Sequence, residues 1–358
     1  MTAVHQFLPV LEPGAVGAHA LAARTVFRDA GYDSEIFAGE IRASYAGEGA
    51  HDAASYGRRF RALPDDRLVY HLAIGSHLAE TLAARAERLV VDYHNLTPLR
   101  YFDGWAPVAA GGVAWGRRQL STLAARAALG IGDSYYNEVE LIEANYARTT
   151  VVPILVPPAA FDVEPDTVTL ARVRSYGAGA VWLFVGRLAP NKAQHDIVKA
   201  FSVYRKVHDP DARLVLVGGS SSDSYELALE RFVERLGLTT AVELAGAVTP
   251  AALAAFYEAA DVFVVCSDHE GFCVPLLEAW HHRVPIVAFA ATAIPETLGD
   301  AGLLLDVKDP YTVAGAVDRV LRDDVVRHAL VEAGLRRLHE FDIATTGAEL
   351  VAAIEKVE

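Results

Sequence analysis

Cysteine is scarce in this chain: its 358 residues include two, Cys266 and Cys273. Two cysteines exclude a disulfide framework and a structural zinc site built from four of them. Cys266, His269 and Cys273 remain as three soft metal ligands, but the sequence favours reduced structural thiols at both cysteine positions. No metal site is therefore expected.

Long apolar runs and a basic leader are also missing. The uncharged apolar stretches, such as residues 284–294, are much shorter than the roughly 20 residues that cross a bilayer. The first residues, MTAVHQFLPVLEPG, lack the positively charged region with which a signal peptide begins. The sequence therefore predicts a cytoplasmic protein without a transmembrane segment.

Positive charge is in deficit, because 32 Lys and Arg stand against 46 Asp and Glu, a formal net charge of -14. Such a surface repels nucleic acid and anionic membranes, so no nucleic-acid partner is expected and an anionic ligand needs a local basic pocket. Hydrophobic residues make up 52% of the chain, which excludes a disordered or low-complexity protein. The length predicts about two domains.

Short β-branched runs alternate with helical patterns along the whole chain, which is typical of parallel sheets built from βαβ units. The predicted strands form two series, residues 4–7, 34–37, 68–72, 89–93 and 128–132, and then 181–185, 213–217, 242–245, 262–266, 286–289 and 302–305. The proline-rich stretch VVPILVPPAAFDVEP between the series predicts a linker. We therefore expect two Rossmann-like, doubly wound α/β domains, residues 1–158 and 159–342, with a C-terminal helix over 343–358 that packs back on the first.

Doubly wound sheets bind ligands beside the carboxyl ends of their strands, so two such domains predict a ligand cleft. The dinucleotide fingerprint GxGxxG is absent, because the glycines at Gly14, Gly17 and Gly218 have the wrong spacing. An NAD-dependent dehydrogenase is therefore a poor match. The D-P-D text over 209–211 precedes a strand and predicts a turn, so a metal-bound sugar nucleotide is not supported either.

The segment 260–279, ADVFVVCSDHEGFCVPLLEA, reads as a strand, a turn and a helix. Pro275 suits the first helical turn, and Gly271 lets the preceding backbone approach a ligand closely. The amides that follow then lie at the positive end of the helix dipole, where an anion or a hydroxyl binds. These amides belong to Phe272, Cys273 and Val274.

Glu270 and Glu278 lie eight positions apart, one before this helix and one inside it. Carboxylates so placed can accept hydrogen bonds from several hydroxyls, one from a sugar and the other from a ribose. Taken alone, the two carboxylates are better explained structurally, Glu270 as an acid favoured by the helix N-terminus and Glu278 as a charge on the helix surface. The surrounding EGF-x-x-P-x-x-EA context favours the binding role.

In this segment the sequence resembles the retaining GT4 glycosyltransferases, whose C-terminal modules carry an E-x7-E element of this form. Companion stretches follow the order of that family: FVGRL over 184–188 with Lys192, the strand end over 215–219, Glu296, and GDAG over 299–302. The resemblance covers most of the chain and is densest from 181 to 306. Several ordered matches are far more specific than one motif.

The resemblance implies a retaining glycosyltransferase of the GT-B fold, with two Rossmann-like domains that face a central cleft. The first domain would bind the acceptor, and the second a UDP-, GDP- or ADP-linked sugar as co-substrate, without cofactor or metal. The acceptor stays open among sugars, lipids and other small molecules. A sugar-nucleotide epimerase, a glycosyl phosphorylase and a non-catalytic sugar-nucleotide sensor remain as alternatives.

Arg187 and Lys192 follow a predicted strand end five positions apart, where a nucleotide diphosphate would bind. A cation there would stabilise the negative charge that builds up on the leaving diphosphate. A solvated pair of loop cations is the alternative. Within the resemblance we expect Arg187, Lys192 and Glu270 to be catalytic and Glu278 and Gly186 to bind the donor.

His94 ends a strand of the first domain, in VVDYHN over 90–95. Similar enzymes often have a histidine there beside the transferred sugar, so the resemblance gives His94 a positioning role, although a lone strand-end histidine is more often structural. Gly17 suits either close approach to the diphosphate or an ordinary turn. Ser134 is expected to cap the next helix.

The chain departs from the family pattern at three positions where the family commonly has glycine. These are Ala193, Cys273 and Arg283. The first two lie beside the expected donor residues, so they put the identity of the sugar in question more than the class of reaction. Arg283 affects how a helix ends.

Overall fold

The computed structural model describes residues 2–61, 63–157 and 160–357. The chain divides into two compact units, of which unit 1 comprises residues 1–99, 108–158 and 341–358 and unit 2 comprises residues 100–107 and 159–340. Residues 158 and 159, which flank the boundary expected from the sequence, lie outside the described residues. Each unit contains its own parallel sheet, which confirms the predicted α/β class with two doubly wound sheets.

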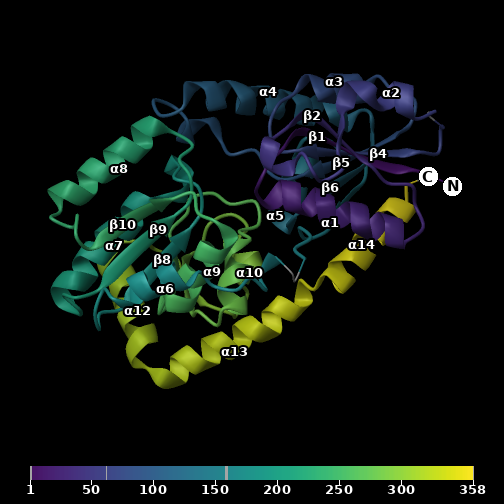
Figure 1. The fold of residues 1–358 in the computed structure, drawn as a ribbon. Helices are drawn as coiled ribbons and strands as arrows, with labels where there is room; N and C mark the ends of the chain where they lie inside the picture. The colour runs from purple at the N-terminus through teal and green to yellow at the C-terminus, as the bar shows by residue number, and fades with distance from the viewer. Residues whose placement is uncertain (1, 62, 158–159, 358) are drawn as a thin grey trace. The chain divides into compact units, whose positions relative to one another are not determined.

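In unit 1 the described strands pair in parallel in the order β3-β2-β1-β4-β5-β6-β7. The inner strands are largely buried because helices cover both faces of the sheet (Figure 1). The predicted strands are present as β1 (Val4–Leu11), β2 (Ile36–Ile41), β4 (Arg67–Leu72), β5 (Arg88–Tyr93) and β6 (Ala127–Gly132). The edge strands β3 (His51–Asp52) and β7 (Thr149–Val151) were not predicted, because they are too short to show a periodic pattern.

The C-terminal helix α14 (Ile343–Glu355) lies beside the N-terminal helix α1 (Ala15–Asp29) in unit 1 (Figure 1). Leu350 and Ile354 enter the same apolar cluster as Phe27. The guanidinium of Arg67 donates to the carbonyls of Ile354 and Val357, at 3.0 and 2.8 Å. The other described helices of this half are α2 (Tyr56–Arg59), α3 (His77–Ala83), α4 (Pro107–Ala124) and α5 (Tyr135–Glu143).

In unit 2 the described strands pair in parallel in the order β10-β9-β8-β11-β12-β13. They are β8 (Val181–Val185), β9 (Arg213–Val217), β10 (Val242–Gly246), β11 (Val262–Val265), β12 (Ile286–Phe289) and β13 (Leu303–Leu305), each within one residue of the prediction. The helices are α6 (Thr167–Arg174), α7 (Gln194–Val207), α8 (Asp223–Arg235), α9 (Pro250–Ala259), α10 (Pro275–His281), α11 (Ile294–Leu298), α12 (Pro310–Arg322) and α13 (Asp324–Glu340). No helix in the described residues combines the length and the apolar character that spanning a bilayer requires.

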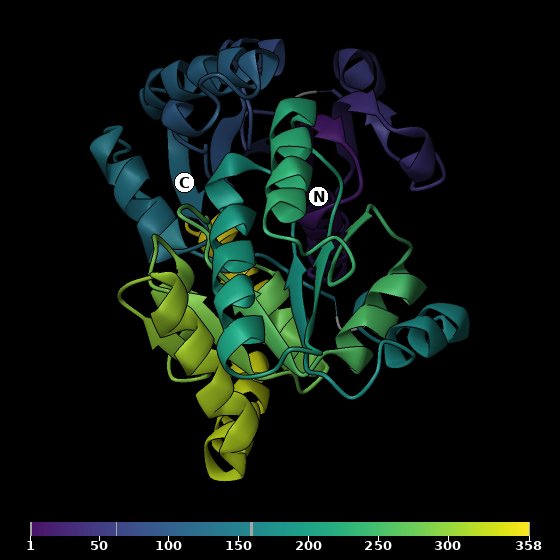
Figure 2. The same cartoon turned by 90° about the vertical axis from the view of Figure 1, so that its left-hand side faces the viewer.

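Helix α7 shows how the unit 2 core is built. Ile197, Phe201 and Tyr204 recur on one face and are buried, while Lys199 on another face is exposed. Phe201 meets Trp182 of the central strand β8 edge to face, with ring centroids 5.5 Å apart. Helix α12 lies alongside α7 over the same apolar cluster (Figures 1 and 2).

Both sheets contain a point where the strand order reverses, between β1 and β4 in unit 1 and between β8 and β11 in unit 2. At such a point the chain leaves the two neighbouring strands toward opposite faces of the sheet, and a crevice opens beside their carboxyl ends. In unit 2 this edge carries residues 186–193 after β8 and 266–274 after β11. These two loops contain most of the donor residues that the sequence predicts.

Candidate active site

Lys192 and Glu270 form an ion pair at the carboxyl edge of the unit 2 sheet. Nζ of Lys192 lies 2.5 Å from Oε2 of Glu270, and the two side chains are 20% and 7% exposed. Lys192 ends the short helix η5 (Pro190–Lys192) after β8, whereas Glu270 lies in the loop after β11. The pair therefore joins the two loops at the switch point. Because loss of either partner would leave the other charge poorly solvated, each side chain keeps the other in place.

The loop after β11 is fastened to its neighbours by backbone and side-chain hydrogen bonds. Asn191 donates from Nδ2 to the carbonyl of His269 at 3.1 Å and accepts at its own carbonyl from the amide of Asp268 at 2.8 Å. Thr292 Oγ1 accepts from the amide of Glu270 and donates back to its carbonyl, both at 2.8 Å. The backbone on both sides of the Glu270 side chain is thus fixed before any ligand binds.

The turn over 271–274 leads directly into α10. Pro275 is the first helical residue, as the sequence predicts. The carbonyl of buried Phe272 accepts from Thr297 Oγ1 at 2.8 Å. Cys273 adopts a left-handed conformation with φ of 79°, and burial raises the pKa of its thiol well above the usual range. The turn is therefore rigid, and its cysteine is a protonated thiol at neutral pH.

Glu278 lies in the first turn of α10, where it is half-buried. Its Oε2 accepts from the hydroxyl of Tyr257 at 2.6 Å, and within the described residues Oε1 has no partner. Burial raises the pKa of Glu278, although the Tyr257 hydrogen bond acts in the opposite direction. The carboxylate also lines a small pocket with Pro250 and His282. It therefore offers one fixed and one available oxygen.

Arg187 follows β8 with its side chain exposed, and it forms no ion pair within the described residues. Its carbonyl accepts from Gln194 Nε2 at 2.9 Å, which fixes the backbone under the side chain. Gly186 and Gly218 both have positive φ, of 154° and 142°. A Cβ on Gly218 would lie 2.1 Å from the carbonyl oxygen of Gly186, so the close approach of these two strand ends requires glycine.

The three residues that lie where a glycine was expected all adopt left-handed backbone conformations. Ala193, Cys273 and Arg283 have φ of 50°, 79° and 58°. Each conformation costs a non-glycine residue roughly 1 kcal/mol or more. The backbone thus follows a path that favours glycine at three positions where the chain has larger residues.

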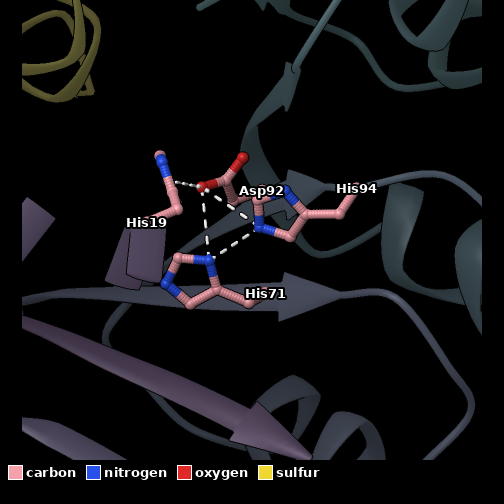
Figure 3. Close-up of side chains that lie close together, drawn as sticks. All are labelled: His19, His71, Asp92 and His94. Atoms are coloured by element: carbon pink, nitrogen blue, oxygen red, sulfur yellow. Dashed lines mark hydrogen bonds and ion pairs between the residues drawn. The ribbon is translucent and has the colours of Figure 1, made fainter. Parts of the chain in front are cut away.

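His94 belongs to a buried cluster that sequence reasoning did not identify, in which the Asp92 carboxylate is joined to all three histidines (Figure 3). His71 of β4 and Asp92 of β5 are partners in the register of the two strands, and His94 follows directly after β5. His19 reaches the same place from α1. One nitrogen or oxygen atom from each of these four side chains lies within 4.8 Å of the other three. No spacing in the sequence marks the cluster, because its members come from three separate elements.

The contacts within this cluster are short. Asp92 Oδ2 is 2.9 Å from His19 Nε2 and 3.3 Å from His71 Nδ1. His94 Nε2 is 2.9 Å from His71 Nδ1 and 3.7 Å from Asp92 Oδ2. His94 Nδ1 is 2.9 Å from Asp133 Oδ2. Both ring nitrogens of His94 are therefore engaged within unit 1, and its side chain is only 1% exposed.

Burial and neighbouring charges shift the proton affinities of the cluster in opposite directions. Burial lowers the pKa of His71 to about 4. Burial also disfavours a charge on His94, but Asp133 and Asp92 outweigh it and raise the pKa of His94 to about 9. Burial alone would raise the pKa of Asp92, yet the charges of His94 and His19 hold it well below its usual range.

Two other residues of unit 1 that the sequence analysis named, Gly17 and Ser134, support the local backbone structure at the start of a helix. A Cβ on Gly17 would lie 2.3 Å from the carbonyl oxygen of Glu12, so this glycine allows the turn into α1 to close. Ser134 caps α5, as predicted, because its Oγ accepts from the amide of Asn137 at 3.2 Å. A role of Gly17 toward a diphosphate remains a prediction.

The two cysteines are free and buried. Burial raises the pKa of Cys266 to about 12, so this thiol, like that of Cys273, stays protonated at neutral pH. The D-P-D text forms the predicted turn, in which Asp209 Oδ1 accepts from the amide of Asp211 at 3.0 Å.

Residues 171–337 match the family described as glycosyl transferases group 1. The D-inositol 3-phosphate glycosyltransferase of Acidothermus cellulolyticus is 35% identical over 206 residues, which are 54% of this chain and 46% of that protein. The protein of the same name from Kineococcus radiotolerans is 30% identical over 260 residues, 68% of this chain and 60% of that one. The chain spans about half the length of the curated relatives that it matches.

Solved structures share the fold of this chain over almost its whole length. Alr3699/HepE of Anabaena, crystallised with UDP and glucose, has a TM-score of 0.79 at 17% identity and covers 99% of both chains. Sucrose-phosphate synthase of Thermosynechococcus elongatus has a TM-score of 0.78 at 18% identity over the same share of each chain. These likenesses confirm the GT-B fold that the resemblance implied.

Proposed function

Because the chain belongs to the group 1 (GT4) glycosyltransferases, we propose that it transfers a sugar from a nucleoside diphosphate sugar to an acceptor, with retention at the anomeric carbon. The observation that carries this proposal is the pair of Lys192 and Glu270, which lies at the switch point of unit 2 and inside the matched residues 171–337. On a chain of net charge -14, cations placed at such an edge are where a diphosphate would be attracted.

In the proposed donor site, Arg187 and Lys192 bind the diphosphate. Negative charge builds up on the leaving diphosphate as its bond to the sugar breaks, so a nearby cation stabilises the transition state more than the ground state. One cation about 4 Å away contributes up to about 4 kcal/mol at an effective dielectric constant of about 20. Glu270 holds Lys192 in place, whereas the exposed guanidinium of Arg187 is free to turn toward the phosphates.

Glu270 and the turn over 271–274 orient the transferred sugar, and Glu278 binds the ribose. The fixed backbone around Glu270 supports the first role, because a positioned carboxylate loses little freedom when a hydroxyl binds. Oε1 of Glu278 is available to ribose hydroxyls while Tyr257 holds Oε2. Gly186 allows the backbone to approach the phosphates.

Unit 1 binds the acceptor in this proposal. His94 is a positioning residue there, because both its ring nitrogens are bonded inside the unit and neither is left for a substrate hydroxyl. The curated relatives are named D-inositol 3-phosphate glycosyltransferases, so a phosphorylated polyol is the first class of acceptor to test.

Transfer takes place on one face of the sugar through an oxocarbenium-like transition state. The bond between the anomeric carbon and the diphosphate oxygen breaks, and the acceptor oxygen forms the new bond to the same carbon. The acceptor proton passes to an oxygen of the departing diphosphate, so the chain need not supply a general base. The products are the glycosylated acceptor and the nucleoside diphosphate.

The proposal is tested by a thermal-shift panel of UDP-, GDP- and ADP-sugars, followed by mass spectrometry of reactions with an acceptor panel. We expect one nucleotide class to raise the melting temperature and to release its diphosphate only when acceptor is present. Epimerised donor without acceptor, or turnover that depends on inorganic phosphate, would instead indicate the alternative enzymes. Donor binding without turnover on any acceptor would indicate a sensor.

Arg187→Ala and Lys192→Ala should each lower turnover by about tenfold to a thousandfold while the chain stays folded. Lys199→Ala is the matched control, because Lys199 is an exposed cation of α7 that pairs with Asp196 on the same helix. Unchanged turnover in both Arg187→Ala and Lys192→Ala would refute their role in stabilising the leaving group.

A further inference from the structure

Lys308 is a partly buried cation at the carboxyl edge of the unit 2 sheet, and the proposed donor site does not use it. It lies in the loop between β13 and α12. Its Nζ is 2.6 Å from Oδ1 of Asp268, 2.7 Å from Oδ2 of Asp196 and 3.2 Å from the carbonyl oxygen of Cys266. An ammonium group has three N–H donors, so these three oxygens engage all of them. Any role of Lys308 in the reaction is therefore exerted through the residues that it holds.

The contacts of Lys308 are sheltered from solvent. Its side chain is 20% exposed, and those of Asp196 and Asp268 are 15% and 33% exposed. The centre of the ring of Phe289, the last residue of β12, lies 5.2 Å from Nζ. Burial alone would lower the pKa of Lys308, but its hydrogen bonds to the two carboxylates raise it. The ammonium group is therefore charged at neutral pH, and its contacts are stronger than those of a fully exposed ion pair.

The contacts of Lys308 with Asp196 and Asp268, here called the bridge, join the same two segments as the ion pair of Lys192 and Glu270. Asp196 lies in the first turn of α7, shortly after Lys192 along the chain. Asp268 lies in the loop after β11, two positions before Glu270. Two sets of ionic contacts thus connect the segment after β8 with the loop after β11. The bridge comes from a third loop, after β13, and holds the other two from outside the donor site.

We propose that Lys308 is a positioning residue of the donor site. Its bridge holds the loop after β11 against the start of α7, and so keeps Glu270 within reach of Lys192. This role rests on the proposed function, in which Lys192 and Glu270 act on the donor. Nζ of Lys192 lies 2.5 Å from Oε2 of Glu270, so a shift of about 1 Å in either segment would stretch the contact to the limit of a hydrogen bond.

Loss of the bridge would leave two like charges facing each other. Asp196 and Asp268 contact the same nitrogen, so their carboxylates are neighbours that repel one another without it. Asp196 belongs to a helix and Asp268 to a loop, so the loop is the part that moves, and Glu270 moves with it. The backbone contacts of Asn191 and Thr292 remain, because they do not involve the bridge. The donor site should therefore be weakened and not abolished.

A purely electrostatic role of Lys308 makes the opposite prediction for one of its partners. If Lys308 only offset negative charge near the diphosphate, removal of the Asp268 carboxylate would favour nucleotide binding. If Lys308 holds the loop, removal of the same carboxylate breaks the bridge and weakens nucleotide binding. Asp268→Ala therefore distinguishes the two roles by the sign of its effect. Asp268 is the better partner to change, because Asp196 also pairs with Lys199.

The experiment measures the affinity of the full chain for UDP, GDP and ADP in separate calorimetric titrations. For the nucleotide that the wild-type chain binds, Lys308→Met and Asp268→Ala should each lower the affinity by about fivefold to fiftyfold. Lys199→Met is the matched control, because Lys199 is a more exposed cation that pairs with the same Asp196 but, within the described residues, forms no ion pair with Asp268. The control should bind the nucleotide within about twofold of the wild type.

A double variant tests whether Lys308 acts through Glu270. Residues that act through one another have non-additive effects. In a Glu270→Gln chain, where the charged contact with Lys192 is already lost, Lys308→Met should lower the affinity by less than about twofold. Lys308→Arg keeps a cation that can contact both carboxylates and should restore most of the affinity. Thermal melting shows whether each variant is folded, and Asp268→Ala tests the bridge independently if Lys308→Met is not.

Wild-type affinity in folded Lys308→Met, or tighter binding in Asp268→Ala, would overturn the positioning role. The proposed function would still stand, because the wild-type chain would bind its nucleotide. Losses that multiply in the double variant would overturn the positioning role as well, since Lys308 would then act independently of Glu270. A wild-type chain that binds none of the three nucleotides would instead refute the proposed function, and the role of Lys308 with it.

Discussion

The two units share a doubly wound parallel sheet but assemble their polar residues in different ways. In unit 2 the candidate residues come from two continuous loops, after β8 and β11, and Lys192 keeps a partly exposed charge. In unit 1 four buried side chains, His19, His71, Asp92 and His94, form what we call the His cluster. They come from α1, β4, β5 and the residue after β5, and are at most 2% exposed. Unit 2 thus keeps a charge within reach of solvent, whereas unit 1 satisfies the charges of its cluster internally.

This difference decides where a substitution should act. A partly exposed cation can form a strong contact with an anion that arrives from solvent, because little existing bonding has to be broken. A buried network in which each group is already bonded can gain little from a large ligand. Single changes in the unit 2 loops should therefore change activity more than stability, and changes in the His cluster should mainly change stability.

The largest effect is expected from Glu270→Gln, and this variant is the strongest test of the comparison. The variant keeps the shape of the side chain but removes the charge that lies 2.5 Å from Lys192 Nζ. We expect kcat/KM to fall by about a hundredfold to a thousandfold, with only a modest drop in melting temperature, because the unpaired Lys192 side chain is still 20% exposed to solvent. Glu230→Gln, on the exposed face of α8, is the control. Turnover within twofold of the wild type would show that unit 2 does not depend on this pair.

A smaller effect, on stability alone, is expected from Gly218→Ala. The new Cβ would lie 2.1 Å from the carbonyl oxygen of Gly186, at a residue with φ of 142°. Both the overlap and the backbone strain predict a loss of about 3 kcal/mol in the free energy of unfolding, measured with urea. Gly219→Ala is a neighbouring control, because its Cβ would meet only Ala247, at 3.6 Å. Equal stability of the two variants would contradict the close approach of the strand ends.

The contrast between the units also explains what the sequence could predict. The proposed donor loops could be predicted because their residues are consecutive, so that EGF-x-x-P-x-x-E and FVGRL are local patterns. The central strands were found for a similar reason, since each is a continuous apolar run. Even the exceptional positions were visible, because Ala193, Cys273 and Arg283 stand where a glycine was expected and have positive φ.

The His cluster could not be read in this way. Its residues are separated by 52, 21 and 2 positions, between His19, His71, Asp92 and His94, and they meet because β4 and β5 pair in a register that places His71 opposite Asp92. A sequence shows neither the register of two parallel strands nor the face of a helix that packs on them. The nearest signal that the chain offers is a polar residue just before the end of each of two neighbouring strands, His71 in β4 and Asp92 in β5.

Glu278→Gln would sharpen the comparison by separating affinity from stability within unit 2. Replacing the carboxylate that is proposed to bind ribose should weaken nucleotide binding by about tenfold, or about 1.4 kcal/mol, measured by calorimetry. Glu258→Gln is the control, because Glu258 is an exposed acid of the neighbouring helix α9. Unchanged nucleotide affinity in Glu278→Gln would refute the ribose contact.

The pH dependence of the same variant follows from the raised pKa of Glu278. Because the pKa is higher in the folded chain than the ordinary 4.5, the folded chain binds this proton more tightly than the unfolded chain. That stabilisation is complete below 4.5 and is lost as the pH rises through the folded value. Glu278→Gln is neutral at every pH, so it should gain stability relative to the wild type across this window by about 1 kcal/mol. A wild-type advantage that grows with pH would contradict this sign.

The smallest effect is expected at Arg283, which ends α10 in a Schellman motif. The amide of Arg283 donates to the carbonyl of Trp280 at 3.0 Å, and the amide of Val284 donates to the carbonyl of Ala279 at 2.9 Å. This motif places Arg283 in the left-handed region, with φ of 58°, and its side chain is exposed. The residue therefore carries backbone strain without the packing that would offset it.

Arg283→Gly should raise the free energy of unfolding by about 1 kcal/mol, because glycine adopts this conformation without a Cβ clash, although its more flexible unfolded chain offsets part of the gain. Arg283→Ala is the decisive control: it removes the same charge but keeps the Cβ, so it should leave the stability nearly unchanged. If both variants were equally stabilised in urea unfolding, the gain would come from the lost charge. The left-handed backbone at Arg283 would then not be the source of strain at this helix end of unit 2.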